Sequence, residues 1–368
     1  MLELDLTHDI YYIIPVFLLS LLVATIIYKP ILAFARKNKF HDVPDERKLQ
    51  REPVPVMGGF VVFISAMVSL LFYWLVRDGM PILPVEIAMI VLLLVGAWDD
   101  VKNLSPRQKF AVEILVVVAM AIANGYGIND FHGLWGIHEV SPWVSWPLTV
   151  VACVGIINAI NMIDGIDGLS SGICIMILLF FSWMLFCSHD FVHAALGVAL
   201  AGGLIPFFIM NVFGRSSKMF IGDAGTMVLG IAICDLMLAM LTKDSLAAQM
   251  FDRKKVCLMA FALAVLAVPI FDTLRVMIGR IMRGRSPFMP DRSHLHHAFI
   301  AYGFHHLETS LLEIILNMLI IYFWMLLDGS HLSMELQLIG VVVAGFTVTV
   351  GLYWLLVIHT PKTMHEST

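Results

Sequence analysis

The chain has 368 residues, of which 60% are hydrophobic and only 14% charged, and its formal net charge is −5. Average soluble domains carry about 25% charged residues, so this composition excludes a soluble protein and leaves no room for a sizeable soluble domain. The net charge itself says little, because in membrane proteins the placement of Lys and Arg matters more than their sum. We expect no nucleic-acid partner.

Apolar segments long enough to cross a bilayer recur along nearly the whole chain. We therefore predict an all-α polytopic membrane protein with about eleven transmembrane helices, organised as a single domain over residues 1–368. The predicted spans cover residues 10–32, 59–76, 82–97, 110–124, 144–160, 169–187, 191–213, 224–241, 256–278, 310–327 and 335–357.

The distribution of basic residues predicts how these spans are oriented. With the N-terminus outside, sixteen Lys and Arg residues fall in the cytoplasmic segments and five fall on the opposite side. This imbalance agrees with the positive-inside rule. The cluster Arg253-Lys254-Lys255 is discordant, and it weakens the prediction of the eighth and ninth spans. Most loops rich in Asp, Asn, His and Gly lie on the predicted cytoplasmic face.

The central motif is Asn-Ala-Ile-Asn-Met-Ile-Asp-Gly-Ile-Asp-Gly at residues 158–168. Four polar residues recur in it at every third position: Asn158, Asn161, Asp164 and Asp167. On a helix this spacing forms one slowly winding polar stripe. Because acids between membrane-length apolar runs are costly, we interpret the stripe as part of a functional site. The alternative is a loop whose Asn and Asp side chains only cap the next helix.

Two adjacent acids, Asp99 and Asp100, close the third predicted span. A helix C-terminus carries partial negative charge, so two carboxylates there need a compensating cation. A metal ion or the nearby Lys102, Arg107 and Lys109 would supply it. The alternative is a solvated start of a loop.

A second acidic motif, Phe-Ile-Gly-Asp-Ala-Gly-Thr at residues 220–226, opens the eighth predicted span. An acid between two glycines at a helix start can present Asp223 to Mg²⁺ while backbone N–H groups face a phosphate. Asn211, Arg215 and Lys218 lie just upstream and are candidates to contact an anionic ligand. Taken alone, the motif is more often an N-cap than a metal ligand.

The richest loop is Pro-Phe-Met-Pro-Asp-Arg-Ser-His-Leu-His-His at residues 287–297. Its candidate diphosphate ligands are Arg292, His294, His296 and His297. A zinc site is the competing interpretation, but the spacing of zinc proteases is missing. Upstream, Asp272 and Arg275 lie inside the ninth span, where a neutralising structural ion pair is the alternative to a functional role.

Taken in order, five motifs resemble those of the polyprenyl-phosphate N-acetylhexosamine-1-phosphate transferases, in particular the bacterial undecaprenyl-phosphate enzymes of glycosyltransferase family 4. The first is Asp-x-Pro-x-x-Arg-Lys at 42–48, followed by Pro-Val-Met-Gly-Gly at 55–59. The acidic pair, the Asn/Asp stripe, the Asp223 motif and the Pro-Asp-Arg-x-His-x-His-His loop complete the set. The resemblance covers about residues 36–305.

The resemblance implies transfer of N-acetylglucosamine-1-phosphate, or a related N-acetylhexosamine-1-phosphate, from a UDP-sugar to undecaprenyl phosphate. UMP is released, and a lipid-linked glycan such as O-antigen, teichoic acid or capsule is begun. The implied cofactor is Mg²⁺, with Mn²⁺ as a substitute. The implied location is the bacterial cytoplasmic membrane, among its lipids, with the active site on the cytoplasmic face. Whether the protein forms a homodimer is left open.

The resemblance also assigns roles to individual residues. It implies catalytic roles for Asp99, Asp100, Asp164, Asp167 and His294, and a metal-binding role for Asp223. It implies nucleotide contacts from Asn161, Asp164, Gly165, Asn211 and Phe220. Phosphate or sugar contacts would come from Arg292, His294, His296 and His297, and lipid-phosphate contacts from Arg107, Lys109 and Lys48.

Two other functions remain as alternatives. The His-x-His-His form resembles the branch that uses a simple UDP-N-acetylhexosamine. The peptidoglycan branch, which takes a UDP-muramoyl-pentapeptide, usually shows three consecutive histidines and is the first alternative. An ion-coupled secondary transporter is the alternative from another class. Such a transporter tends to show inverted repeats, which this sequence lacks.

Overall fold

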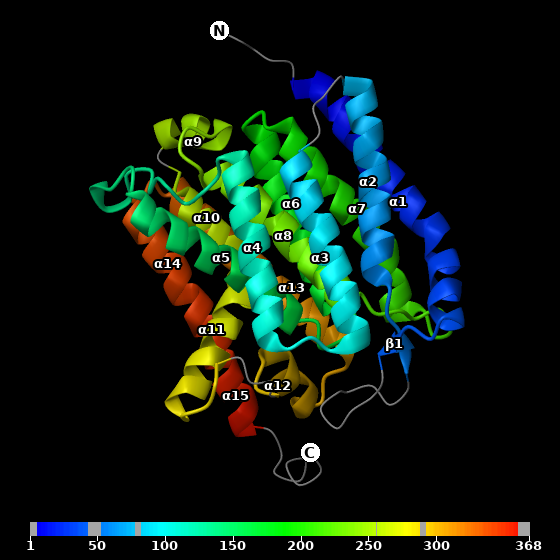
Figure 1. The fold of residues 1–368 in the computed structure, drawn as a ribbon. Coiled ribbons are helices and arrows are strands. Elements are labelled where there is room, and N and C mark those ends of the chain that lie inside the picture. Colours follow the sequence, from blue (N-terminus) through cyan, green and yellow to red (C-terminus); the bar gives the residue numbers. More distant parts are fainter. Residues whose placement is uncertain (1–5, 43–52, 78–81, 255, 288–291, 360–368) are drawn as a thin grey trace.

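The computed structural model describes residues 6–42, 53–77, 82–254, 256–287 and 292–359. Helices form nearly all of its regular structure (Figure 1). They are α1 (Leu6–Lys37), α2 (Gly58–Arg77), α3 (Leu83–Lys102), α4 (Pro106–Asn124), α5 (Pro142–Met162), α6 (Leu169–Cys187), α7 (Phe191–Phe213), α8 (Gly222–Leu241), α9 (Leu246–Phe251), α10 (Leu258–Val265), α11 (Ala267–Met282), α12 (Leu295–Tyr302), α13 (His306–Gly329), α14 (Met334–Phe346) and α15 (Leu352–His359). Two short strands, β1 (His41–Asp42) and β2 (Val54–Pro55), pair antiparallel. Short helical turns cover Leu134–Gly136, Asp252–Lys254 and Thr347–Gly351.

Within the described residues, eight helical segments are long and apolar enough to cross a membrane, and the bent pair α10–α11 makes a ninth. This confirms an all-α, multi-pass architecture. The spans predicted at 82–97 and 110–124 are also helical, as α3 and α4, but α3 carries four charged residues and α4 carries three. Most of that charge lies where α3 ends and α4 begins. The full count of about eleven spans and their orientation therefore stay predictions.

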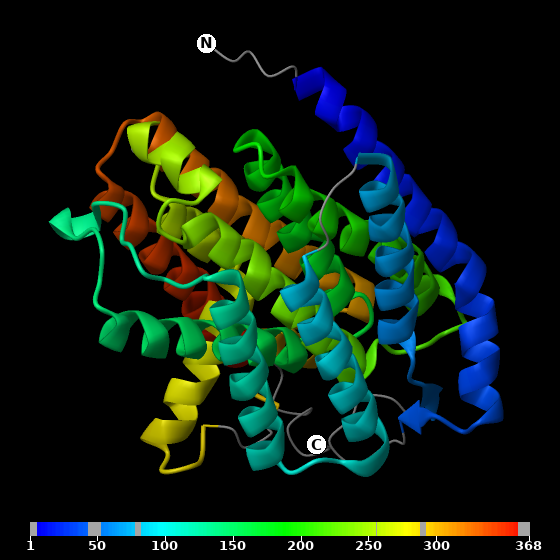
Figure 2. The ribbon, with the colours of Figure 1, turned by 45° about the horizontal axis from the view of Figure 1, so that its top comes forward.

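Helix α8 forms the centre of the bundle. Every residue of its apolar membrane-length segment is buried, and the helix packs against α2, α3, α5, α6 and α7. Small residues permit this close packing, as in other membrane helix pairs. A Cβ placed on Gly96 of α3 would lie only 2.5 Å from the Ala224 backbone of α8. In the turned view, α1 lies outside this core, beside α2 (Figure 2).

The ninth predicted span, 256–278, is not one continuous helix. It divides near Leu266 into α10 and α11, which are bent by 76° relative to each other. The side chain of Asn317 on α13 binds the backbone that the break leaves open. Its Oδ1 accepts a hydrogen bond from the Val268 amide at 2.8 Å, and its Nδ2 donates to the Val265 carbonyl at 3.0 Å. A break inside a membrane requires such a partner, because no water is present to satisfy the backbone.

Two of the sequence motifs meet in a small cluster of backbone hydrogen bonds at one end of the bundle. The Phe220 amide donates to the Pro55 carbonyl at 2.8 Å, and the Gly58 amide donates to the Phe220 carbonyl at 2.9 Å. The segment that follows β2 is thereby joined to the start of α8. This joint fixes where α8 begins, and with it the position of Asp223.

Candidate active site

The turn between α3 and α4 brings Lys109 back onto Asp99. Asn103 ends α3 in the left-handed conformation, and the Leu104 amide donates to Oδ1 of Asp99 at 2.6 Å. Ser105 then begins α4 with a capping box that it forms with Gln108. As a result, the Lys109 ammonium lies 3.2 Å from Oδ2 of Asp99. Of the three cations that the sequence offered for the acidic pair, the structure selects Lys109.

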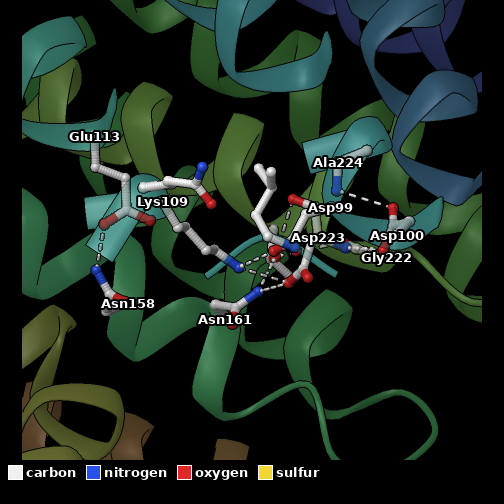
Figure 3. A network of polar contacts seen from close by, with 12 residues as sticks. Asp99, Asp100, Lys109, Glu113, Asn158, Asn161, Gly222, Asp223 and Ala224 are labelled. Carbon is white, nitrogen blue, oxygen red and sulfur yellow. Dashed lines mark hydrogen bonds and ion pairs between the residues drawn. The ribbon is translucent and has the colours of Figure 1, made fainter. Parts of the chain in front are cut away.

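The same ammonium group contacts Asp223. Lys109 Nζ lies 3.0 Å from Oδ1 of Asp223, so one lysine bridges acids from α3 and α8 (Figure 3). Asn161 of α5 donates from Nδ2 to the Asp223 carboxylate and, at 2.8 Å, to Thr226 Oγ1. Four helices therefore meet at Asp223. We call Asp99, Asp100, Lys109, Asn161 and Asp223 the central cluster.

Asp100 contacts backbone rather than another side chain. Its carboxylate accepts hydrogen bonds from the Asp223 amide at 2.8 Å and the Ala224 amide at 3.3 Å. These are unpaired amides at the N-terminus of α8, where a carboxylate is favourable. Burial, with a further contribution from the Asp223 charge, raises the pKa of Asp100 to about 8. The N-cap role, which was the alternative interpretation of the Asp223 motif, is thus filled by Asp100, and the Asp223 carboxylate contacts Lys109 and Asn161 instead.

Charge in the central cluster is balanced around Lys109. Burial lowers the pKa of Lys109, but Asp223 and Asp99 outweigh it and hold that pKa above its ordinary value. Burial and the Asp223 charge raise the pKa of Asp99, although Lys109 opposes them. The lysine is therefore a resident cation between two carboxylates.

The predicted polar stripe is helical only in its first half. Helix α5 ends at Met162, so Asn158 and Asn161 lie on the helix, while Asp164 and Asp167 lie in the turn that follows. The Ser170 hydroxyl donates to Asp164. Burial raises the pKa of Asp164 to about 7, and the charges of Asp223 and Asp167 add to this effect. The stripe thus divides between the central cluster and the loop at 163–168.

Asp167 belongs to a separate set of ionic contacts. Its Oδ2 lies 2.6 Å from Lys218 Nζ and 3.1 Å from His306 Nδ1. Burial raises the pKa of Asp167, but the hydrogen bonds from His306 and Lys218 outweigh it and hold that pKa below its ordinary value. The Ser310 hydroxyl donates to the Asp167 carbonyl at 2.8 Å. Asp167 therefore fixes its loop to α13.

The residues predicted to bind the nucleotide have different surroundings. Asn211 uses both ends of its amide on backbone: Oδ1 accepts from Gly168 at 2.8 Å, and Nδ2 donates to Met219 at 3.0 Å. Phe220 is partly buried, with Lys218 Nζ 5.4 Å from its ring centroid. Asn211 positions the loop in this structure, whereas the Phe220 ring keeps exposed surface.

The histidine motif is held by a buried acid. His294 Nδ1 lies 2.8 Å from Oδ2 of Asp272, and Arg275 Nη2 lies 2.6 Å from Oδ1 of the same residue. The Leu295 amide at the start of α12 also donates to Asp272. The structural ion pair considered from the sequence is thus present. It also orients His294, because a hydrogen bond at Nδ1 fixes the ring and directs Nε2 away from it.

His296 links the histidine motif to the Asp164 loop. Its side chain is buried, and a Cβ on Gly165 would overlap its Nε2. Burial lowers the pKa of His296 well below its ordinary value, and the neighbouring His297 adds to this effect, so the ring is neutral. Neither ring nitrogen has a hydrogen-bond partner within the described part of the chain. Buried polar atoms without partners are unusual, and here they lie beside the loop at 163–168.

Three further predicted residues, Arg292, Arg107 and His297, have side chains that are at least partly exposed. Arg292, in the middle of the motif loop, and Arg107, in the first turn of α4, are exposed. His297 is partly buried, with its ring centroid 4.2 Å from that of His296. Lys48, predicted to bind the lipid phosphate, lies outside the described residues.

The residues of the central cluster fit a Mg²⁺ ion, although nowhere in the described structure do three His, Cys, Asp or Glu side chains form a ready metal site. Mg²⁺ typically takes one or two protein carboxylates together with substrate phosphates and waters. Asp223 and Asp99 offer hard oxygen donors, and the Lys109 ammonium shows that this position attracts a cation. The site therefore suits a cation that arrives with its phosphate ligands.

Comparisons with known proteins agree with this geometry. The family model described as glycosyl transferase family 4 matches residues 82–241, which contain the whole central cluster. A Bacillus subtilis (strain 168) protein, a "probable undecaprenyl-phosphate N-acetylglucosaminyl 1-phosphate transferase", is 28% identical over 80% of this chain and 79% of its own length.

Two further relatives carry the name undecaprenyl-phosphate alpha-N-acetylglucosaminyl 1-phosphate transferase. The Yersinia pestis protein is 29% identical over 72% of this chain and 70% of its own length. The Escherichia coli (strain K12) protein is 26% identical over 82% and 80%. The family match over residues 82–241 and these relatives support the resemblance of the chain to glycosyl transferase family 4.

Proposed function

We propose that this protein transfers N-acetylglucosamine-1-phosphate, or a related N-acetylhexosamine-1-phosphate, from a UDP-sugar to undecaprenyl phosphate. The products are UMP and a lipid diphospho-sugar, the first intermediate of a lipid-linked glycan. The names of the relatives support this reaction. The observation that carries it is the single ammonium group shared by Asp99 and Asp223, because phosphoryl transfer needs acids and a cation within one small volume.

In the net reaction, an oxygen of the lipid phosphate forms a bond to the phosphorus that carries the sugar. The bond from that phosphorus to the UMP oxygen breaks, and UMP leaves with the electron pair. Little proton transfer is needed, because a phosphate monoester with a second pKa near 6 is mostly a dianion at pH 7. Most of the acceleration therefore comes from positioning and from neutralising charge.

The central cluster supplies both effects. In this proposal, Asp223 would hold Mg²⁺, which would supply neutralisation of the diphosphate charge, and Asn161 orients the Asp223 carboxylate through its hydrogen bond. Asp99 positions the attacking lipid phosphate, and Asp100 fixes the N-terminus of α8 so that its amides stay in place.

The surrounding motifs would hold the rest of the substrate. We place the uridine near Asp164, Gly165 and the Phe220 ring, and the sugar phosphate near the neutral His296. His294, oriented by Asp272, contacts the diphosphate or the sugar. The two ring nitrogens of His296 have no partner among the described residues, which supports this assignment: the N–H of the neutral ring can donate to a phosphate or hydroxyl oxygen, and the other nitrogen can accept from a hydroxyl.

We further propose that the motif-bearing end of the bundle faces the cytoplasm of a bacterium, where UDP-sugars are made. The sixteen basic residues on that side of the predicted topology support this orientation. The prenyl chain of the acceptor would then stay in the bilayer while its phosphate reaches the central cluster at the interface.

The test is release of UMP by the purified protein in detergent, supplied with undecaprenyl phosphate, Mg²⁺ and UDP-N-acetylglucosamine. We expect UMP that depends on both lipid and metal and that disappears in Asp99→Asn. Substituting UDP-N-acetylgalactosamine defines the sugar preference. A folded preparation that releases no UMP from any UDP-N-acetylhexosamine would contradict the proposal.

A further inference from the structure

The central cluster continues inward along α4 and α5 to a buried acid that neither the sequence motifs nor the proposed reaction uses. Glu113 lies on α4 four residues after Lys109, and its side chain is completely inaccessible. Residues four apart share one face of a helix and lie within reach of each other. Glu113 and Lys109 therefore project to the same side of α4, and Figure 3 shows Lys109 between Glu113 and Asp223.

Within the described residues, one oxygen of Glu113 has a hydrogen-bond partner and the other has none. Asn158 Nδ2, on α5, lies 2.6 Å from Oε2 of Glu113 and also donates to the Val154 carbonyl at 2.9 Å. Oε1 of Glu113 is buried without a hydrogen-bond partner among the described residues. A buried carboxylate oxygen in that condition is costly, so its retention needs an explanation.

Lys109 offers an explanation for the unpaired oxygen of Glu113. It lies one helical turn before Glu113 on the same face of α4. In the present structure, however, the ammonium contacts Asp99 and Asp223 instead. It thus occupies the space between the two carboxylates that suit a divalent cation. A cation that binds Asp223 must displace this ammonium, and a displaced ammonium inside a protein needs another counter-charge.

We propose that Glu113 is a positioning residue that receives the Lys109 ammonium when a divalent cation takes its place at Asp223. Lys109 then moves along its own helix face, from Asp99 and Asp223 toward Oε1 of Glu113. Asn158 holds Glu113 in the orientation that leaves Oε1 available. This inference rests on the metal-binding part of the proposed function, and it explains how one site accommodates both a lysine and a metal ion.

The experiment measures Mn²⁺ binding to the full-length protein in detergent by electron paramagnetic resonance, with no nucleotide or lipid present. Mg²⁺ competition confirms that both ions use one site. We expect Glu113→Gln to weaken Mn²⁺ binding by about tenfold, the value of one charge-assisted hydrogen bond. Glutamine still accepts the hydrogen bond from Asn158, so the fold is retained.

Removing the lysine distinguishes displacement from a structural effect. In the Lys109→Gln background nothing has to be displaced, so adding Glu113→Gln should leave Mn²⁺ affinity unchanged. A tenfold loss that persists without Lys109 would show that Glu113 acts through the fold and would overturn the proposal.

The two proposals fail in different ways. If the wild-type protein binds Mn²⁺ and Glu113→Gln binds it equally well, the inference about Glu113 is wrong and the metal role of Asp223 stands. If the folded wild-type protein binds no Mn²⁺ at concentrations that support its activity, both the metal role and this inference are wrong.

Discussion

Gly165 and His296 lie in direct contact, although they are far apart in the sequence. A Cβ placed on Gly165 would lie only 2.4 Å from Nε2 of the buried His296 ring. The Asp164 loop and the histidine motif are therefore one structural unit. An acid whose pKa is raised by burial and a neutral imidazole belong to that unit.

This contact predicts that Gly165→Ala abolishes most activity. The added methyl group forces His296 or the loop to move, and overpacking of this kind costs about 1–3 kcal/mol of stability. We expect the rate of UMP release to fall by about a hundredfold or more, because a displacement of about 1 Å has that effect at a reacting centre. Gly155→Ala is the matched control, since a Cβ there meets nothing within 4 Å. Normal activity in Gly165→Ala would contradict the packing described.

Replacing Asp223 tests the metal site directly. Asp223→Asn keeps the size of the side chain and removes the charge that attracts a divalent cation. We expect kcat to fall by about 10²–10³-fold, with partial recovery at high Mg²⁺. The measurement is UMP release across a Mg²⁺ series. Asp244→Asn, an exposed acid in another loop, is the control. Near-normal turnover of Asp223→Asn at low Mg²⁺ would show that Asp223 does not hold the metal.

The Asp272–His294 contact predicts different results for its two members. Asp272→Asn leaves Arg275 without its buried counter-charge, and breaking such a pair costs about 3–5 kcal/mol. We expect this variant to lose both activity and several degrees of thermal stability. His294→Gln removes only the oriented imidazole, so activity should fall while the unfolding temperature changes little. His305→Gln is the control, because its side chain is 86% exposed. A His294→Gln variant with full activity would remove His294 from the site.

The contacts of His132, at the end of the bundle opposite the central cluster, predict that the stability of the fold depends on pH. Burial lowers the pKa of His132, but its hydrogen bonds to Asp252 and to the Leu241 carbonyl outweigh this, and the net effect raises that pKa. A histidine whose pKa is raised in the folded protein stabilises the fold when it is protonated. This contribution is fully present below the pKa of the residue in the unfolded chain, about 6.5. The contribution is lost as the pH rises through the folded value.

The measurement is the thermal unfolding midpoint between about pH 6 and pH 8.5. The wild-type midpoint should fall by about 2 °C or more across this range, relative to His132→Gln, which lacks the titrating group. His138→Gln, in the same loop with a side chain 74% exposed, should behave like the wild type. Equal pH dependence in wild type and His132→Gln would show that His132 does not contribute.

Much of the fold was predictable because membrane helices have clear chemical ends. The spans predicted at 169–187 and 191–213 coincide with α6 and α7 residue for residue. Gly168 precedes the first, and Asp190 caps the second by accepting a hydrogen bond from the His193 amide. The division near Leu266 was not predictable, because hydropathy continues through it and its stabilising partner, Asn317, lies on another helix.

The site was predictable in its residues but not in its pairings. Asp99, Asp223 and Asn161 were recognisable from local motifs, whereas the choice of Lys109 over Lys102 and Arg107 depends on the turn between α3 and α4. Glu113 was missed because a single acid in an apolar helix matches no motif. The available signal was its spacing of four residues from Lys109. Asp167 is a similar case, because its two partners, Lys218 and His306, come from distant segments.

The complete burial of α8 has a consequence for biogenesis and for the response to lipids. A helix with protein on every side takes no support from the bilayer, so its final position is set only after its neighbours have entered the membrane. Its early neighbours α2, α3 and α5 precede it in the chain, and a nascent chain that stops before α8 has an unfilled centre. In the mature protein, a change in bilayer thickness reaches Asp223 only through those outer helices.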